Sequence, residues 1–390
     1  SGWLLWFEQQ KLGRLNTLHS MKRVERLKIW CSSVARPSPL LAYLSSNVLV
    51  EQLSEQDWSL MFSEARQAGL LNRLSASLRK AGRAEIQYPE RLHKHVLATS
   101  IQTDAFQRDV HRELGHIQQA LSELHAPVLL LKGASYLLLG LPAAMGRIFT
   151  DIDILVPRQY LPSAEAFLML GGWSTGKLEP YDQRYYREWS HEIPPMTHLR
   201  RGTTIDLHHS LVMPTCRIHV DSEKMLRDAV PIDPIGFWWR LRDEDILLHA
   251  ASHLILNSEF ERGLRDLWDI DFLFRHFVSC SASFPERLLE RSEEIGLVKV
   301  IRQALFLAKR IFGTQVPDQL LPDKHGLFLR LVACAASTRH PDTRSNWQGV
   351  ADALLMYREM YMRLPNHLLA VHFVHKASGL LKRVEEKAAV

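Results

Sequence analysis

Apolar residues recur at three- and four-residue spacing in two long regions of the chain, which is the period of amphipathic helices. The first region runs from about residue 39 to residue 125 and includes DWSLMFSEARQAGLLNRLSASLRKAG. The second begins at about Gly236 and includes EDILLHAASHLILNSEF and ERLLERSEEIGLVKVIRQALFLAKRIFG. We read FWWRLRDED, near its beginning, as the start of a helix that packs on the core. The pattern therefore predicts two helical regions with a different kind of structure between them.

Short apolar runs separated by turns fill the part between the helical regions. APVLLLKG and FTDIDILVP read as strands, ASYLLLGL as one or two helical turns, and LPSAEAFLMLGGW as an amphipathic helix stopped by glycines. SHEIPPMTHLR and TTIDLHHSLV flank an Arg201-Gly202 turn, as a hairpin or as adjacent strands would. We therefore expect an α+β protein with four segments: an N-terminal extension (1–35), a helical N-terminal region (36–125), a sheet-containing core (126–235) and a helical C-terminal domain (236–390).

Composition and charge narrow the class of protein. A chain of 390 residues with 46% hydrophobic residues can fill the cores of two or three domains, and its formal charge of +5 favours anionic ligands such as nucleotides. The four cysteines lie far apart without a Cys-x-x-Cys pair, so a reducing cytoplasm is the expected compartment. The longest apolar run, residues 128–145, contains Lys132 and a proline, so we expect no membrane span. GWLLWF, near the N-terminus, is too short for a secretory signal.

Asp151 and Asp153 lie one residue apart in the apolar stretch GRIFTDIDILVP. On a strand, such positions point to one face about 6.6 Å apart, whereas Ile152 and Ile154 point to the other face. Two like charges at this distance are unfavourable unless a cation lies between them or one of them is protonated. The pair therefore predicts a site for Mg²⁺, which takes oxygen ligands. The alternative is an ordinary solvated face of an edge strand.

The later segment TTIDLHHS repeats the alternation and places Asp206 and His208 on one face. If this strand lies beside the first, Asp206 becomes a third carboxylate near the same cations and can help to deprotonate an acceptor hydroxyl. An exposed edge strand is the alternative.

Lys132 and Gly133 lie where the first apolar run leads into a short helix. Gly133 would let the backbone approach a phosphate, the N-terminus of the helix would offer N–H groups, and Ser135 could add a hydroxyl donor. The alternative is an ordinary turn. A glycine turn, then Asp-x-Asp, then one Asp on a later strand is a specific joint arrangement, and it predicts nucleotide phosphates held by metal.

LLLKGASYLLLG, GRIFTDIDILVP and HEIPPMTHLRRGTTIDLHHSL, in this order, resemble the uncharacterised nucleotidyltransferase family of the DNA polymerase β-like superfamily, over roughly residues 125 to 275. The resemblance implies a mixed sheet flanked by helices, with residues 126–235 as the catalytic core. It also implies two Mg²⁺ ions, with Mn²⁺ as an alternative, bound by Asp151, Asp153 and Asp206. Lys132 and Gly133 fall on the phosphate-binding turn of the family.

Arg147 matches an arginine that the family places ahead of the aspartate pair, where it could contact a phosphate through a planar fork. The chain also departs from the family pattern. Gly133 is followed by Ala134 rather than by serine, and Asp151 lies 18 positions after Gly133, which implies an inserted turn around Leu141-Pro142. None of these departures removes an expected metal ligand.

His249 and His253 share one helix face, and Arg265, Asp266 and Asp269 follow on the next helix. We interpret them as a polar network between the two helices, with a contribution to nucleotide or acceptor binding as the alternative. A zinc protease motif is not favoured, because the glutamate that it needs after the first histidine is absent.

His191, which precedes EIPP, is expected at the rim of the same sheet, either on the acceptor side or as an exposed polar residue. We group His208, His253 and Asp269 with it as residues that support the carboxylates or contact the acceptor.

The sequence thus predicts an enzyme that transfers an NMP unit from an NTP to a hydroxyl acceptor, with release of pyrophosphate. The acceptor is a small molecule, a protein or RNA, and a protein partner is left open. Two other functions stand beside it: a catalytically inactive regulator that binds a nucleotide or a partner, and a transferase that adds nucleotides to a tRNA end. Strong, salt-sensitive RNA binding would be typical of the latter.

Overall fold

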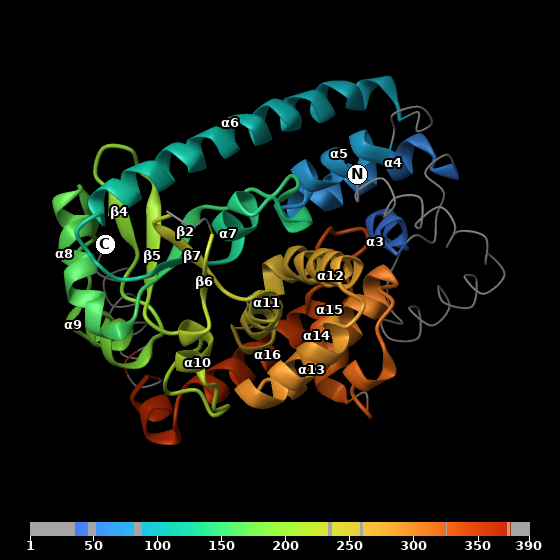
Figure 1. Ribbon diagram of the computed structural model, residues 1–390. Coiled ribbons are helices and arrows are strands. Elements are labelled where there is room, and N and C mark those ends of the chain that lie inside the picture. Colours follow the sequence, from blue (N-terminus) through green and yellow to red (C-terminus); the bar gives the residue numbers. More distant parts are fainter. Residues whose placement is uncertain are drawn as a thin grey trace, which may run out of the picture.

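A seven-stranded mixed sheet lies beside a large group of helices in the computed structural model (Figure 1). The structure describes residues 36–45, 52–81, 88–232, 236–257, 260–324, 326–372 and 375. The expected N-terminal extension, residues 1–35, lies outside the described residues. The α+β class and the mixed sheet expected from the sequence are confirmed.

The strands follow the order β3-β4-β5-β2-β1-β7-β6 across the sheet. The pairs β2–β5 and β1–β7 are parallel, and the other neighbours are antiparallel. Their bounds are β1 (Val128–Leu130), β2 (Asp151–Leu155), β3 (Trp173–Thr175), β4 (Met196–His198), β5 (Thr204–His208), β6 (Val230–Pro231) and β7 (Trp238–Arg240).

The α-helices of the described residues, in chain order, are α3 (Pro39–Leu44), α4 (Glu55–Gln67), α5 (Leu71–Ala81), α6 (Glu90–Ala120), α7 (Lys132–Leu138), α8 (Leu161–Leu170), α9 (Pro180–Arg184), α10 (Ser222–Arg227), α11 (Asp243–Asn257), α12 (Gly263–Cys280), α13 (Phe284–Ile295), α14 (Val298–Phe312), α15 (Leu327–Ala335) and α16 (Gln348–Arg363). Within the described ranges, none of the helices is both long and apolar enough to cross a membrane.

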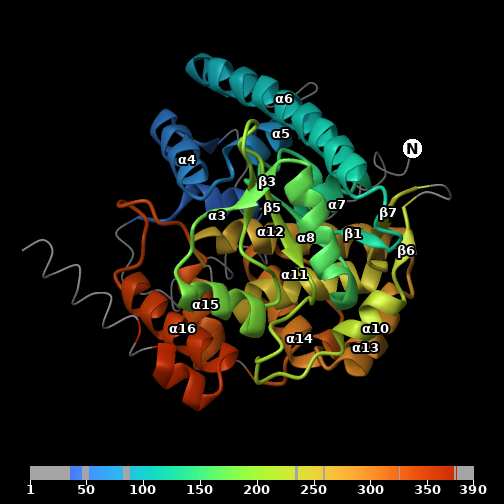
Figure 2. The same ribbon diagram turned by 90° about the vertical axis from the view of Figure 1, so that its left-hand side faces the viewer.

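The long helix α6 and the shorter α8 cover one face of the sheet. Ile152 and Ile154 of β2 and Ile205 and Leu207 of β5 lie in one buried cluster with apolar residues of these two helices. Helix α6 continues beyond the sheet to α4 and α5, as both views show (Figures 1 and 2). Because side chains alternate along a strand, the polar residues of β2 and β5 must point to the opposite face.

A second, larger core joins the N-terminal helices to the C-terminal helices. Leu40 of α3, Trp58 of α4 and Leu74 of α5 belong to the same buried cluster as Leu248 of α11 and Phe274 of α12. The two helical regions expected from the sequence are therefore packed against each other, although the sheet separates them along the chain. Whether the four expected segments fold as separate domains stays a prediction.

Most of the expected elements in the middle of the chain are confirmed, and one is wrong. The strands around residues 128 and 151, the helix after Leu161 and the hairpin around Arg201-Gly202 are present. The expected helix start at FWWRLRDED is incorrect for its first residues, because Trp238–Arg240 form β7 and pair with β1, and the helix begins only at Asp243. A run of three residues is too short for its period to separate strand from helix, and tryptophan fits a half-buried sheet well.

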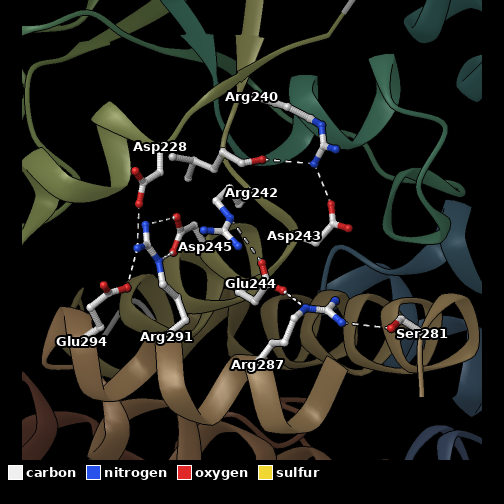
Figure 3. A network of polar contacts seen from close by, with 11 residues as sticks. Asp228, Arg240, Arg242, Asp243, Glu244, Asp245, Ser281, Arg287, Arg291 and Glu294 are labelled. Atoms are coloured by element: carbon white, nitrogen blue, oxygen red, sulfur yellow. Dashed lines mark hydrogen bonds and ion pairs between the residues drawn. The ribbon is translucent and has the colours of Figure 1, made fainter. Parts of the chain in front are cut away.

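A buried ion-pair network fixes α11 against α13 (Figure 3). Two nitrogens of Arg291 in α13 donate to the two carboxylate oxygens of Asp245 in α11, each at 2.8 Å. The same guanidinium reaches Asp228 at 2.8 Å and Glu294 at 2.7 Å. Asp245 is fully buried and Arg291 is 5% exposed, so these charges are satisfied by one another. The network holds α11, which lines the site described next, in a fixed position.

Candidate active site

The three expected carboxylates lie on one face of two adjacent strands. In the parallel pairing of β2 with β5, Asp153 is directly opposite Asp206, and Asp151 is opposite Thr204. Neighbouring strands are about 4.8 Å apart, so the side chains of Asp153 and Asp206 start from neighbouring points on that face. The fold therefore brings together two chain segments that lie about fifty residues apart.

Asp153 is already held by two basic groups. Lys132 Nζ donates to Asp153 Oδ1 at 2.7 Å, and His208 Nε2 lies 3.1 Å from the same oxygen. Burial alone would raise the pKa of Asp153, but Lys132 and His208 outweigh it and hold this pKa far below its usual range. Asp153 is therefore ionised at neutral pH.

Asp206 has the opposite character. Its Oδ1 is buried and has no hydrogen-bond partner among the described residues. Burial, followed by the negative charges of Glu192, Asp153 and Asp151, raises the pKa of Asp206 to about 8. A buried acceptor atom without a donor, surrounded by other carboxylates, is a position that a cation would stabilise. Three carboxylates on two strands are also the oxygen ligands that Mg²⁺ takes, so the residues present fit this ion.

A cleft opens beside Asp151 and Asp153, between β2, α7 and the helices α11 and α12. Asp206 is not part of its wall. Four basic side chains and four aspartates balance each other in this wall, and divalent ions bound at the aspartates would make it net positive, as a polyphosphate requires. The lining residues are Lys132, Gly133, Tyr136, Arg147, Phe149, Asp151, Asp153, Ala250, His253, Arg262, Arg265, Asp266 and Asp269.

Arg147 lies in this wall, and its guanidinium is fixed by Asp269 of α12. Arg147 Nη1 donates to Asp269 Oδ2, and Arg73 Nη2 of α5 forms an ion pair with Asp269 Oδ1 at 2.7 Å. Arg73 is 1% exposed and also donates to the carbonyl oxygens of Ala143 and Met145. A helix of the N-terminal region thus determines where Arg147 sits in the cleft.

The Lys132-Gly133 turn is shaped by packing as well as by the site. Lys132 has a φ of +43°, a left-handed conformation that is sparsely populated for a residue with a side chain, and it directs its amine to Asp153. A Cβ at Gly133 would lie 2.6 Å from a ring carbon of Phe149, so any other residue would have to displace this ring. Ser135 is buried outside the lining of the cleft, and its Oγ has no hydrogen-bond partner among the described residues. The structure therefore gives Ser135 no contact with the cleft.

His249 and His253 both lie on α11, as expected, and His253 contacts α12. His253 Nδ1 of α11 is 3.6 Å from Asp266 Oδ2 of α12, and both residues line the cleft. His249 is buried, and burial lowers its pKa well below the ordinary value. Arg265 donates to Asp266 at 3.0 Å. The polar network between the helices is present, and four of its five expected members, His253, Arg265, Asp266 and Asp269, line the cleft.

His191 lies beside β5, next to Glu192, and its ring centroid is 5.2 Å from that of His208. Glu192 forms an isolated antiparallel bridge with His208 of β5. Glu192, Arg73 and Arg262 were not predicted as site residues. Glu192 carries no signal beyond standing beside His191, and Arg73 reads as one more polar position in an amphipathic helix. Arg262 lies just before α12, among ordinary surface charges.

Comparisons with known proteins give one result. Searches of curated proteins and of solved structures find no match to this chain. The sequence profile of a family described as "Uncharacterised nucleotidyltransferase" matches residues 54–313, which is two thirds of the chain and includes α4 to α6 as well as the sheet. The chain belongs to the uncharacterised nucleotidyltransferase family.

Proposed function

We propose that this chain is a Mg²⁺-dependent enzyme that transfers an NMP unit from an NTP to a hydroxyl acceptor and releases pyrophosphate. The observation that carries the proposal is the register of β2 and β5, which puts Asp153 opposite Asp206 and leaves Asp151 on the same face at the cleft. Family membership supports nucleotidyl transfer in general. The acceptor we propose is a small molecule, a protein or RNA.

Asp151, Asp153 and Asp206 would hold the divalent ions, Mg²⁺ or Mn²⁺. Bound there, such ions would offset the charge that develops on the attacking and leaving oxygens of an in-line displacement. The fit rests on the Oδ1 of Asp206, which is buried without a partner among the described residues, and on the three negative charges around it.

Side chains of the protein would bind the phosphates and accept the proton of the acceptor. Arg147 and Lys132 bring positive charge to the cleft wall, where the phosphates of an NTP would lie. Asp206 lies on the same face of the sheet as Asp151 and Asp153, outside the lining of the cleft. It would receive the proton of the acceptor hydroxyl as the hydroxyl oxygen bonds to the α-phosphorus and the bond to the β-phosphate oxygen breaks.

We place this activity in the cytoplasm. Cys216, Cys280 and Cys334 are free thiols in the described part of the chain, which agrees with a reducing compartment.

Label transfer tests the proposal. The full chain is incubated with each of the four α-labelled NTPs, Mg²⁺ and fractions of a cell lysate, and Asp151→Asn is compared with the wild type and with Asp109→Asn. Asp109 is exposed on α6 and is a matched control. We expect label from at least one NTP to appear on an acceptor with the wild type and the control, and none with Asp151→Asn.

Two results would count against the proposal. Transfer that persists in Asp151→Asn would place the chemistry elsewhere. A nucleotide that raises the melting temperature of the protein without release of pyrophosphate in any fraction would favour a regulator that only binds nucleotide.

A further inference from the structure

A second group of potential metal ligands lies beside the three aspartates. It consists of His191, Glu192 and His208, whose ligand atoms all lie within 4.8 Å of one another. Glu192 Oε2 is 3.3 Å from His208 Nε2 and 3.7 Å from His191 Nε2. Donor atoms around a tetrahedral Zn²⁺ are about 3.3–3.6 Å apart, as bond lengths of about 2.0–2.2 Å require. These donors therefore need little movement to meet one ion.

Backbone contacts hold the three residues in this arrangement. Glu192 is bridged to His208, and the backbone N–H groups of His209 and Ser210 donate to the carbonyl oxygen of His191 at 2.9 and 3.2 Å. The rings of His191 and His208 have centroids 5.2 Å apart. The group is thus fixed by β5 and the segment that lies against it, rather than by flexible side chains at the surface.

The Nε2 atoms of both histidines face Glu192, and the three side chains are largely enclosed by the protein. His208 is fully buried, and the side chains of His191 and Glu192 are 12% and 21% exposed. Glu192 also adds a negative charge beside Asp206. His208 Nε2 also lies 3.1 Å from Asp153 Oδ1, so an ion bound at this nitrogen would take the place of that contact.

We propose that His191, Glu192 and His208 bind a Zn²⁺ ion at a site distinct from that of the three aspartates. Two imidazole nitrogens and one carboxylate form a ligand set that Zn²⁺ uses in open sites, whereas Mg²⁺ takes oxygen ligands. Three protein ligands leave one position free for water or for an oxygen of a bound molecule. Asp153 Oδ1 lies 3.1 Å from His208 Nε2, so the two metal sites would be neighbours. This site goes beyond the proposed function, because it does not require nucleotidyl transfer.

Cobalt binding tests the proposal without any nucleotide. The full chain is freed of metal with a chelator and titrated with Co²⁺, while visible absorption is recorded and metal content is measured by elemental analysis. We expect one Co²⁺ per chain to give the visible bands of a four- or five-coordinate nitrogen-containing site, apart from any Co²⁺ at the oxygen ligands of the aspartates. These bands should be lost when one equivalent of Zn²⁺ is added. His191→Ala and Glu192→Gln should each weaken binding by at least about 100-fold, because even loss of an outer partner of a metal ligand costs 10–100-fold.

Two further variants show where the ion binds. His116 is exposed on α6, so His116→Ala should bind Co²⁺ as the wild type does. Asp151→Asn removes a carboxylate of the other site and should also keep the cobalt bands. Circular dichroism shows whether each variant is folded, and Glu192→Gln is the variant to compare if His191→Ala does not fold.

Three results would overturn the proposal: a wild-type protein that gives no cobalt bands, a Glu192→Gln variant that binds as tightly as the wild type, or loss of the bands in Asp151→Asn. Because the measurement needs no NTP, its failure would leave the transfer proposal standing. Absence of label transfer would equally leave the zinc site standing.

Discussion

Two regions of this protein bury carboxylates, and they do so in opposite ways. Between α11 and α13, both oxygens of the fully buried Asp245 accept from the fork of Arg291. Between β2 and β5, Asp206 keeps a buried oxygen without a donor among the described residues. Burial raises the pKa of both aspartates. At Asp245 the hydrogen bonds and charge of Arg291 oppose this rise, whereas at Asp206 the charges of Glu192, Asp153 and Asp151 add to it. The first region uses its charges to hold helices together, and the second leaves them available for a ligand.

The largest effect is expected when the satisfied pair loses its cation. Arg291→Met would leave Asp245 buried without a counterion and should lower the free energy of unfolding by about 3–5 kcal/mol. Urea denaturation at pH 7 measures this. The double variant Arg291→Met, Asp245→Leu should recover most of the loss, since no buried charge is then left unpaired. A single variant that loses less than about 1 kcal/mol would show that the pair is more hydrated than the structure indicates.

The opposite sign is expected at the unsatisfied site. The pKa of Asp206 is about 8 in the folded chain and near 3.8 when unfolded, so the unfolded state releases this proton first as the pH rises. The folded state is therefore destabilised progressively from about pH 4 to pH 8, and fully above pH 8. Without metal, Asp206→Asn should be about 2–4 kcal/mol more stable than the wild type at pH 8.5, and close to it at pH 4.

Melting temperatures in the presence of a chelator check this prediction, with Asp109→Asn as the control. A difference between Asp206→Asn and the wild type that does not change with pH would contradict the raised pKa. A variant that is more stable and yet inactive would show that the site sacrifices stability for ligand binding.

The local structure of this site, its two strands and their acidic faces, can be predicted from the sequence. The alternation in TDIDILV and in TTIDLHH predicts two strands and puts the acidic residues of each strand on one face. It does not predict which strands are neighbours. The placement of β2 beside β5, with Asp153 opposite Asp206, depends on the packing of Ile152 and Ile205 against α6 and α8.

Contacts between residues far apart in the sequence could not be predicted from it. Arg73 lies 196 positions before Asp269, and nothing in the amphipathic pattern of α5 marks it as the counterion of a residue in α12. Glu192 joins the site only because its segment bridges to β5. In both cases the contact joins distant parts of the chain, and hydrophobic periodicity predicts only local structure.

Arg73 lies between the two extremes, because its charge is buried and paired, but with Asp269, a residue of the cleft wall. Arg73→Met should cost about 1–3 kcal/mol, since it leaves the carbonyl oxygens of Ala143 and Met145 without a donor while Arg147 still neutralises Asp269. Urea denaturation compares it with Arg79→Met, an exposed arginine on the same helix, which should change little. An equal loss of unfolding free energy in the two variants would show that the buried contacts of Arg73 do not stabilise the protein.

The smallest effect is expected where the geometry of Arg291 recurs at the surface. Arg187 also presents a fork to a carboxylate, with 3.0 and 2.7 Å to the two oxygens of Glu165, but its side chain is 43% exposed. Water and salt screen such a pair, so Arg187→Ala should cost about 0.2–1 kcal/mol in low salt and less in about 0.5 M NaCl. Urea denaturation at the two salt concentrations measures it. The two forks have nearly the same hydrogen-bond lengths, so a smaller loss of unfolding free energy at Arg187 than at Arg291 would point to burial as the cause. A loss at Arg187 as large as that at Arg291 would mean that the fork itself, and not its burial, stabilises the protein.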